Sequence, residues 1–276
     1  MHTMHFACSA TLWQCRSFCI SRTAPCTRNK ILTVFDDTLR KGLTLILNVD
    51  MFDDHWIQAS LPVHLGGLGV RSAEKLAPSA FLASAASTFS LHNDILAGSI
   101  LSFKDKYTSD ATISWKSLSH AEIPPEPASR FQKVWDMVAS SAIYNDILTG
   151  CPGDADQARL KATNSPHAGD WLNALPIASV GLRLSDEEIR VAVGYRLRSF
   201  ICQPYQCVCG SFVDARGLDG LSFRKSAPRH VRHSLINDIL WRAIKKAQVL
   251  ACKEPVVGLS RSDGKRRRCY VNSLVT

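Results

Sequence analysis

Three cysteines fall within a short stretch near the C-terminal end, and a glycine follows the last of them: Cys202, Cys207, Cys209 and Gly210. Thiolates separated by one to four residues can bind one Zn²⁺ from a tight turn, and glycine favours such a turn. Candidates for a fourth ligand lie downstream: Asp219, His230 and His233. We take Cys202, Cys207, Cys209 and His230 as the candidate zinc ligands. The alternative interpretation is a set of reduced thiols without metal.

The excess of positive charge is confined to one part of the chain. The net charge is +9, but residues 224–268 alone contain 13 Lys or Arg and three acidic residues, and the remainder sums to −1. Clustered basic residues bind a phosphate backbone because they release its counterions. A solvated helix face with a basic tail is the alternative. The predicted phosphate contacts are Arg224, Lys225, Arg229, Arg232, Arg242, Lys245 and Lys246.

Two pairs of adjacent aspartates, Asp36–Asp37 and Asp53–Asp54, are the only such pairs in the chain. A polymerase centre needs an aspartate pair in a hairpin, and a third aspartate on an earlier strand, to hold two Mg²⁺ ions. Both pairs lie in helix-like patterns, so we interpret them as helix capping and solvated residues. No nucleophile elbow or P-loop is present. The sequence therefore predicts no catalytic site.

The elements that would position these residues are mainly helical. Apolar residues at three- and four-residue spacing predict helices over 31–49, 131–148, 154–163 and 230–248. Asp53, Ser72 and Ser185 are expected to cap three more helices. Glycines 66, 67 and 69 predict a turn. The tryptophans are expected to be core residues on apolar faces or helix junctions: Trp56, Trp115, Trp135, Trp171 and Trp241.

Composition limits the class of protein. No apolar run is long enough for a membrane span, and the N-terminal residues lack the basic segment of a signal peptide. The ten cysteines are too unevenly placed for a secreted disulfide scaffold. We expect an intracellular protein, nuclear or cytoplasmic and not secreted, with reduced thiols.

Two segments resemble a known family. The first is LPVHLGGLGVRSAEKLAPSAFLASAA at 61–86, and the second runs from 166 to 261 and includes CVCG, VDARG, HSLINDILWRA and KEPVVGLSRS. They resemble the region that follows the polymerase core in reverse transcriptases of non-LTR retrotransposons. The resemblance covers about residues 22–266. It implies a helical thumb and linker, a zinc knuckle and the start of a restriction-like endonuclease.

The chain departs from that family at its metal sites. Asp219 stands where the knuckle of the family has a histidine, and Phe223 where it has its last cysteine. Aspartate can bind zinc but phenylalanine cannot, so the resemblance implies a degenerate knuckle. After Arg266 the sequence diverges, and the metal-binding aspartate and catalytic lysine of the nuclease have no counterpart; Glu254 alone cannot form that site.

The expected fold is mainly α: a helical thumb and linker bundle, a small loop-rich degenerate zinc knuckle, and a basic C-terminal helix. The expected division is 1–21 (leader), 22–127 (thumb-like), 128–200 (helical linker) and 201–276 (knuckle, basic helix and nuclease edge). The most credible internal boundary lies at Pro124, Pro125 and Pro127.

We expect a truncated retrotransposon-derived protein without an active site that binds DNA or RNA through its basic region. The alternative is a non-catalytic helical scaffold, or a translated pseudogene without a selected role. Exposed apolar helix faces, above all on the helix at 31–49, are expected to promote self-association.

Overall fold

The computed structural model describes residues 19–95, 106–180, 182–207, 210–218, 228–249, 251–253 and 271–273. The chain divides into two compact units, Met1–Gln203 and Pro204–Thr276. The predicted boundary at 200/201 lies close to this division. The predicted thumb-like and linker ranges both fall within the first unit.

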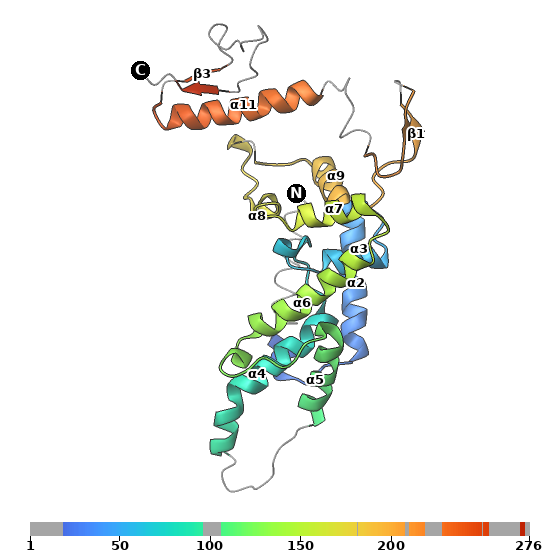
Figure 1. Ribbon diagram of the computed structural model, residues 1–276, viewed down its shortest axis with the longest axis vertical. Helices are drawn as coiled ribbons and strands as arrows, with labels where there is room; N and C mark the ends of the chain where they lie inside the picture. Colours follow the sequence, from blue (N-terminus) through green and yellow to red (C-terminus); the bar gives the residue numbers. More distant parts are fainter. Residues whose placement is uncertain are drawn as a thin grey trace. The chain divides into compact units, whose positions relative to one another are not determined.

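Unit 1 is built from helices, as predicted (Figure 1). They are α2 (Lys30–Leu47), α3 (Asp53–Ala59), α4 (Ala73–Ile95), α5 (Lys106–Ser119), α6 (Gln132–Thr149), α7 (Asp154–Thr163), α8 (Asp170–Asn173) and α9 (Asp186–Leu197). Short 3₁₀ turns occur at η1 (Val63–Leu65), η2 (Ala128–Arg130) and η3 (Ala178–Val180). The periodicity that predicted helices over 31–49, 131–148 and 154–163 is confirmed within two residues at each end.

Helices α4, α5 and α6 pack together around two tryptophans. Trp115 and Trp135 are fully or almost fully buried, and their rings meet edge to face with centroids 4.8 Å apart. Both indole N–H groups are satisfied, because Trp115 donates to the carbonyl of Trp135 and Trp135 to that of Ser129. Helices from both sides of Pro127 therefore share one core.

A second core joins α2, α3 and α9. Helix α2 buries Leu39, Leu43 and Leu47, which lie four residues apart along one face. Trp56 is buried among them, and Trp171 packs against them, as predicted. On other faces of α2, side chains stay exposed: Ile31 (71%), Val34 (63%) and Leu45 (81%).

Two of the three predicted caps are confirmed. Ser185 and Glu188 form a capping box at the start of α9, and the Ser72 hydroxyl accepts from the N–H of Lys75 at the start of α4. The prediction for Asp53 was wrong: Phe52 is the capping position of α3, and Asp53 is its first helical residue. The Asp53 carboxylate instead pairs with Arg40 at 2.6 Å.

The described part of unit 2 contains two antiparallel strand pairs and one long helix. Strands β1 (Tyr205–Gln206) and β2 (Phe212–Val213) pair antiparallel, with Tyr205 opposite Val213. Helix α11 (Pro228–Lys246) begins within two residues of the predicted 230–248. Strands β3 (Ala251–Lys253) and β4 (Val271–Ser273) also pair antiparallel. Among the described residues of either unit, no helix is long and apolar enough to cross a membrane.

Candidate functional site

The predicted zinc ligand Cys207 lies at the tip of the β1–β2 hairpin. Its N–H donates to the carbonyl of Ser211, and its carbonyl accepts from the N–H of Gly210, both at 2.8 Å. Gly210 has φ +88°, a left-handed conformation that favours glycine. A tight turn therefore follows Cys207, as its spacing to Gly210 predicted.

The other predicted metal ligands are not brought together by the described structure. Cys202 is half-buried and belongs to unit 1. Cys209 and Asp219 lie outside the described residues, and so do the side chains of His230 and His233 within α11. In the described ranges, no three His, Cys, Asp or Glu side chains gather closely enough to hold a metal ion. The zinc site stays a prediction.

The last turns of α11 carry three of the predicted phosphate contacts. Arg242, Lys245 and Lys246 are exposed, and no ion pair to an acidic group neutralises them within the described part of the chain. The ammonium of Lys245 lies 4.9 Å from the ring centre of Trp241, a cation–π contact. Trp241 is half-buried, as Trp171 is, whereas Trp56, Trp115 and Trp135 are buried.

The structure does not describe the side chains of the four other predicted phosphate contacts. Arg229 and Arg232 belong to α11, so they share a helix with the three exposed cations, but their side chains are outside the described residues. Arg224 and Lys225 lie outside the described residues altogether.

One aspartate of the first pair caps a helix other than its own. The pair was interpreted as capping and solvated residues, but Asp36 is buried at 5% exposure. Its carboxylate accepts from the Ser72 hydroxyl and from the N–H groups of Ala73 and Glu74. Asp36 on α2 therefore caps α4, a helix 36 residues away in sequence, while its neighbour Asp37 is exposed. Burial raises the pKa of Asp36, and these hydrogen bonds partly offset the rise.

The glycine-containing turn at 61–70 is held by a buried arginine. Arg196 on α9 is 5% exposed, and its guanidinium donates to three carbonyls, those of Val63, Gly67 and Ala168. Burial lowers the pKa of Arg196. Since these acceptors are neutral, the arginine acts as a structural clamp on the turn. No sequence spacing had singled it out.

Gln58 extends this clamp. Its amide nitrogen donates to the carbonyls of Gly66 and Arg196, and its amide oxygen accepts from Arg159. Arg159 also donates to the Arg196 carbonyl. One polar network thereby joins the turn at 61–70 to helices α3, α7 and α9.

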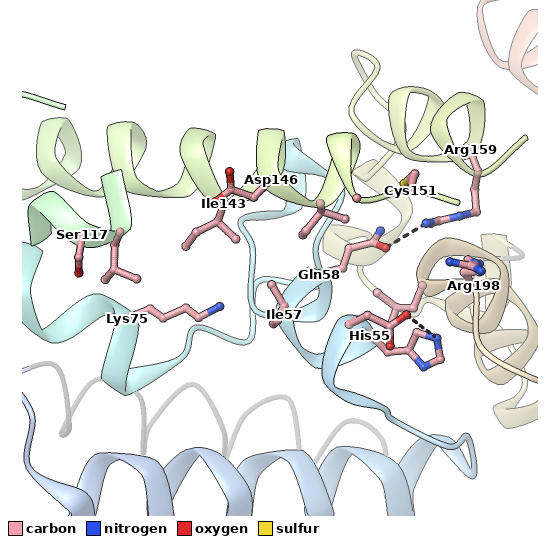
Figure 2. Close-up of a pocket in the computed structure, with 15 residues that line it drawn as sticks. His55, Ile57, Gln58, Lys75, Ser117, Ile143, Asp146, Cys151, Arg159 and Arg198 are labelled. Atoms are coloured by element: carbon pink, nitrogen blue, oxygen red, sulfur yellow. Dashed lines mark hydrogen bonds and ion pairs between the residues drawn. The ribbon is translucent and has the colours of Figure 1, made fainter. Parts of the chain in front are cut away.

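A cavity of about 410 Å³ lies beside this network in unit 1 (Figure 2). Lys75 from α4 and Asp146 from α6 line one part of it. His55, Arg159 and Arg198 line another part, near Gln58 (Figure 2). Burial lowers the pKa of His55, so this ring is neutral near pH 7. The cavity was not predicted, because its wall combines residues from six separated segments.

No family model, curated protein or solved structure matches this chain. Its functional interpretation therefore depends on its own residues.

Proposed function

We propose that this protein binds nucleic acid through the basic residues of 224–246, as a non-catalytic derivative of a reverse transcriptase-like protein. The observation that carries the proposal is the cluster of three exposed cations, Arg242, Lys245 and Lys246, at the end of α11. These cations belong to the one region that holds all of the net positive charge. Their charge suits a phosphate backbone, and such contacts do not depend on base sequence.

The test is a fluorescence titration of the full chain with short DNA and RNA duplexes at several salt concentrations. The variant Arg242→Gln/Lys245→Gln/Lys246→Gln removes three charges from the cluster. Each lost phosphate contact lowers the salt slope of log K by about 0.9 on DNA, so the slope is expected to fall by about 3.

The matched control removes three exposed lysines of unit 1: Lys30→Gln/Lys106→Gln/Lys161→Gln. The net charge changes equally in both triple variants. The proposal predicts that the control keeps the wild-type salt slope. Equal losses in the two variants would mean that affinity follows net charge alone, and would contradict a site on α11.

We further propose that the β1–β2 hairpin contributes a metal-binding turn, with Cys207 and Cys209 as ligands and Cys202 and His230 as the remaining candidates. The tight turn from Cys207 to Gly210 supports this role, since closely spaced thiolates on such a turn can share one metal ion. Titration with Co²⁺ tests it: thiolate coordination gives a charge-transfer absorption that Cys207→Ser should abolish. A chain that gives no such band has a metal-free hairpin.

A scaffold role is the second candidate function. It is favoured by apolar side chains exposed on α11: Leu235 (55%), Ile236 (54%), Ile239 (64%) and Leu240 (43%). Such a face predicts self-association or a protein partner. Concentration-dependent light scattering, together with no salt-sensitive nucleic-acid binding, would favour this function over the first.

A further inference from the structure

The cavity in unit 1 has the size and wall of a small-molecule site. Its volume of about 410 Å³ falls within the range of ligand pockets. Five aliphatic side chains line it: Ile57, Leu118, Ile143, Ile147 and Leu197. An aliphatic wall interrupted by a few charged groups favours a ligand with an apolar body and one polar end.

Lys75 supplies the polar group. Its side chain extends from the first turn of α4 toward Ile57 (Figure 2). It is half-buried, and among the described residues its ammonium makes no hydrogen bond or ion pair. Burial lowers its pKa, which reflects the cost of removing this ammonium from water. An anion that reached the ammonium would offset that cost.

Three acidic residues attract the Lys75 ammonium: Glu74, Asp36 and Asp146. The first of them, Glu74, is exposed to solvent. The Asp36 carboxylate already accepts three hydrogen bonds from Ser72, Ala73 and Glu74. Asp146 is largely exposed and lies 3.9 Å from His120. Solvent screens such an exposed carboxylate, so it neutralises the buried ammonium only weakly.

The opposite part of the wall also favours a negative ligand. Arg159 and Arg198 both lie near the carboxylate of Asp156, at 3.9 and 3.0 Å. With Lys75 they place three cationic side chains in the cavity wall, against the two carboxylates of Asp54 and Asp146. This excess favours an anionic ligand over a cationic one.

We propose that this cavity binds an amphiphilic organic anion. Its carboxylate or phosphate accepts hydrogen bonds from Lys75, and its apolar body lies against the aliphatic wall formed by Ile57, Leu118, Ile143, Ile147 and Leu197. The proposal is independent of nucleic-acid binding, because every residue in it belongs to unit 1.

Calorimetric titration with octanoate tests the charge requirement. Lys75→Met keeps an unbranched side chain of similar length and is expected to weaken octanoate binding by about tenfold or more, as expected for a hydrogen bond to a charged group. Lys75→Arg keeps the charge and should stay within about threefold of wild type. Lys30→Met, at an exposed lysine outside the cavity wall, is the matched control and should bind as wild type.

Related ligands test whether binding needs both the negative charge and the apolar body. Octyl phosphate is expected to bind as octanoate does, whereas octan-1-ol, which lacks the charge, and inorganic phosphate, which lacks the apolar body, should each bind at least about tenfold more weakly. Equal binding of inorganic phosphate and octyl phosphate would overturn the amphiphilic part of the proposal.

The reactivity of Cys151 tests whether the ligand binds in the cavity. It lines the cavity and is half-buried, while Cys19 is exposed and provides a reference thiol. Saturating octanoate should slow alkylation of Cys151 several-fold and leave Cys19 unchanged, and Lys75→Met should remove this protection. Binding that is equal in wild type and Lys75→Met, or that leaves Cys151 unprotected, would overturn the proposal.

The Arg242→Gln/Lys245→Gln/Lys246→Gln variant should retain octanoate binding within about twofold. Loss of nucleic-acid binding and loss of octanoate binding are thus separate results.

Discussion

Two glycine-containing turns of this chain are stabilised in different ways. The turn at 61–70 in unit 1 is held by buried side chains from distant helices, above all Arg196 and Gln58. The β1–β2 hairpin of unit 2 pairs through its backbone and buries Val213, while Tyr205 and Phe212 are exposed. The first turn therefore has its conformation fixed by side chains from distant helices. The second turn would gain stability from the metal that we propose for it.

Removing the clamp should have the largest effect on stability. Arg196→Met leaves the carbonyls of Val63, Gly67 and Ala168 without their buried donor. We expect a loss of about 3 to 5 kcal/mol in the free energy of unfolding, measured by urea denaturation. Arg130→Met is the control: Arg130 is 46% exposed and pairs with Glu126 at 3.6 Å, so its loss should cost less than about 0.5 kcal/mol. Similar costs for the two variants would contradict the clamp.

A glycine-to-alanine pair compares the two turns directly. A Cβ at Gly67 would lie 2.0 Å from the Leu61 carbonyl oxygen, so the backbone must shift, and we expect a cost of about 2 to 4 kcal/mol. A Cβ at Gly210 meets nothing within 4 Å, and its φ of +88° alone should cost about 1 to 2 kcal/mol. Thermal unfolding of both variants measures which substitution destabilises the protein more. If Gly210→Ala were the more damaging, the hairpin would be the more constrained turn.

The Asp36 cap should have a smaller effect. Asp36→Ala removes the acceptor for Ser72 and for two N–H groups of α4, and we expect a loss of about 2 kcal/mol. Asp37→Ala, at the exposed neighbouring aspartate, should change stability by less than about 0.5 kcal/mol.

The cost of Asp36→Ala should also depend on pH. Because burial raises the folded-state pKa of Asp36 above its ordinary 3.8, the folded protein binds this proton more tightly than the unfolded chain. The wild type should therefore gain stability over Asp36→Ala as the pH falls from the raised pKa toward 3.8, and gain no more below it. Unfolding measured across this range with a constant or opposite difference would show that the carboxylate is not desolvated.

Local signals in the sequence predicted most of the helices, but not what joins them. Apolar spacing along α2 and α6, and the Ser185 capping box, depend on residues within a few positions of each other, so they can be read from one segment. Asp36 was interpreted as a capping or solvated residue, but the sequence did not indicate that it caps α4, because its three donors lie at the start of that distant helix. Arg196 gave no signal at all, because neutral backbone carbonyls have no sequence signature.

The candidate sites also divide into those that local sequence predicts and one that depends on tertiary packing. The turn after Cys207 was predicted from local spacing and is present. The exposed basic residues of α11 follow from the charge of one segment. The cavity around Lys75 could not be predicted, since it depends on tertiary packing of helices that are distant in sequence.

Hydrogen exchange of the full chain, with and without a short DNA duplex at low salt, tests the central claim most directly. If α11 is the binding surface and the turn at 61–70 is a preformed structural element, the duplex should slow exchange of amides in the last turns of α11, residues 239–246. Exchange in 61–70 should be unchanged. Slowed exchange in 61–70 with none in α11 would contradict the account, because nucleic acid would then bind the clamped turn rather than the basic helix.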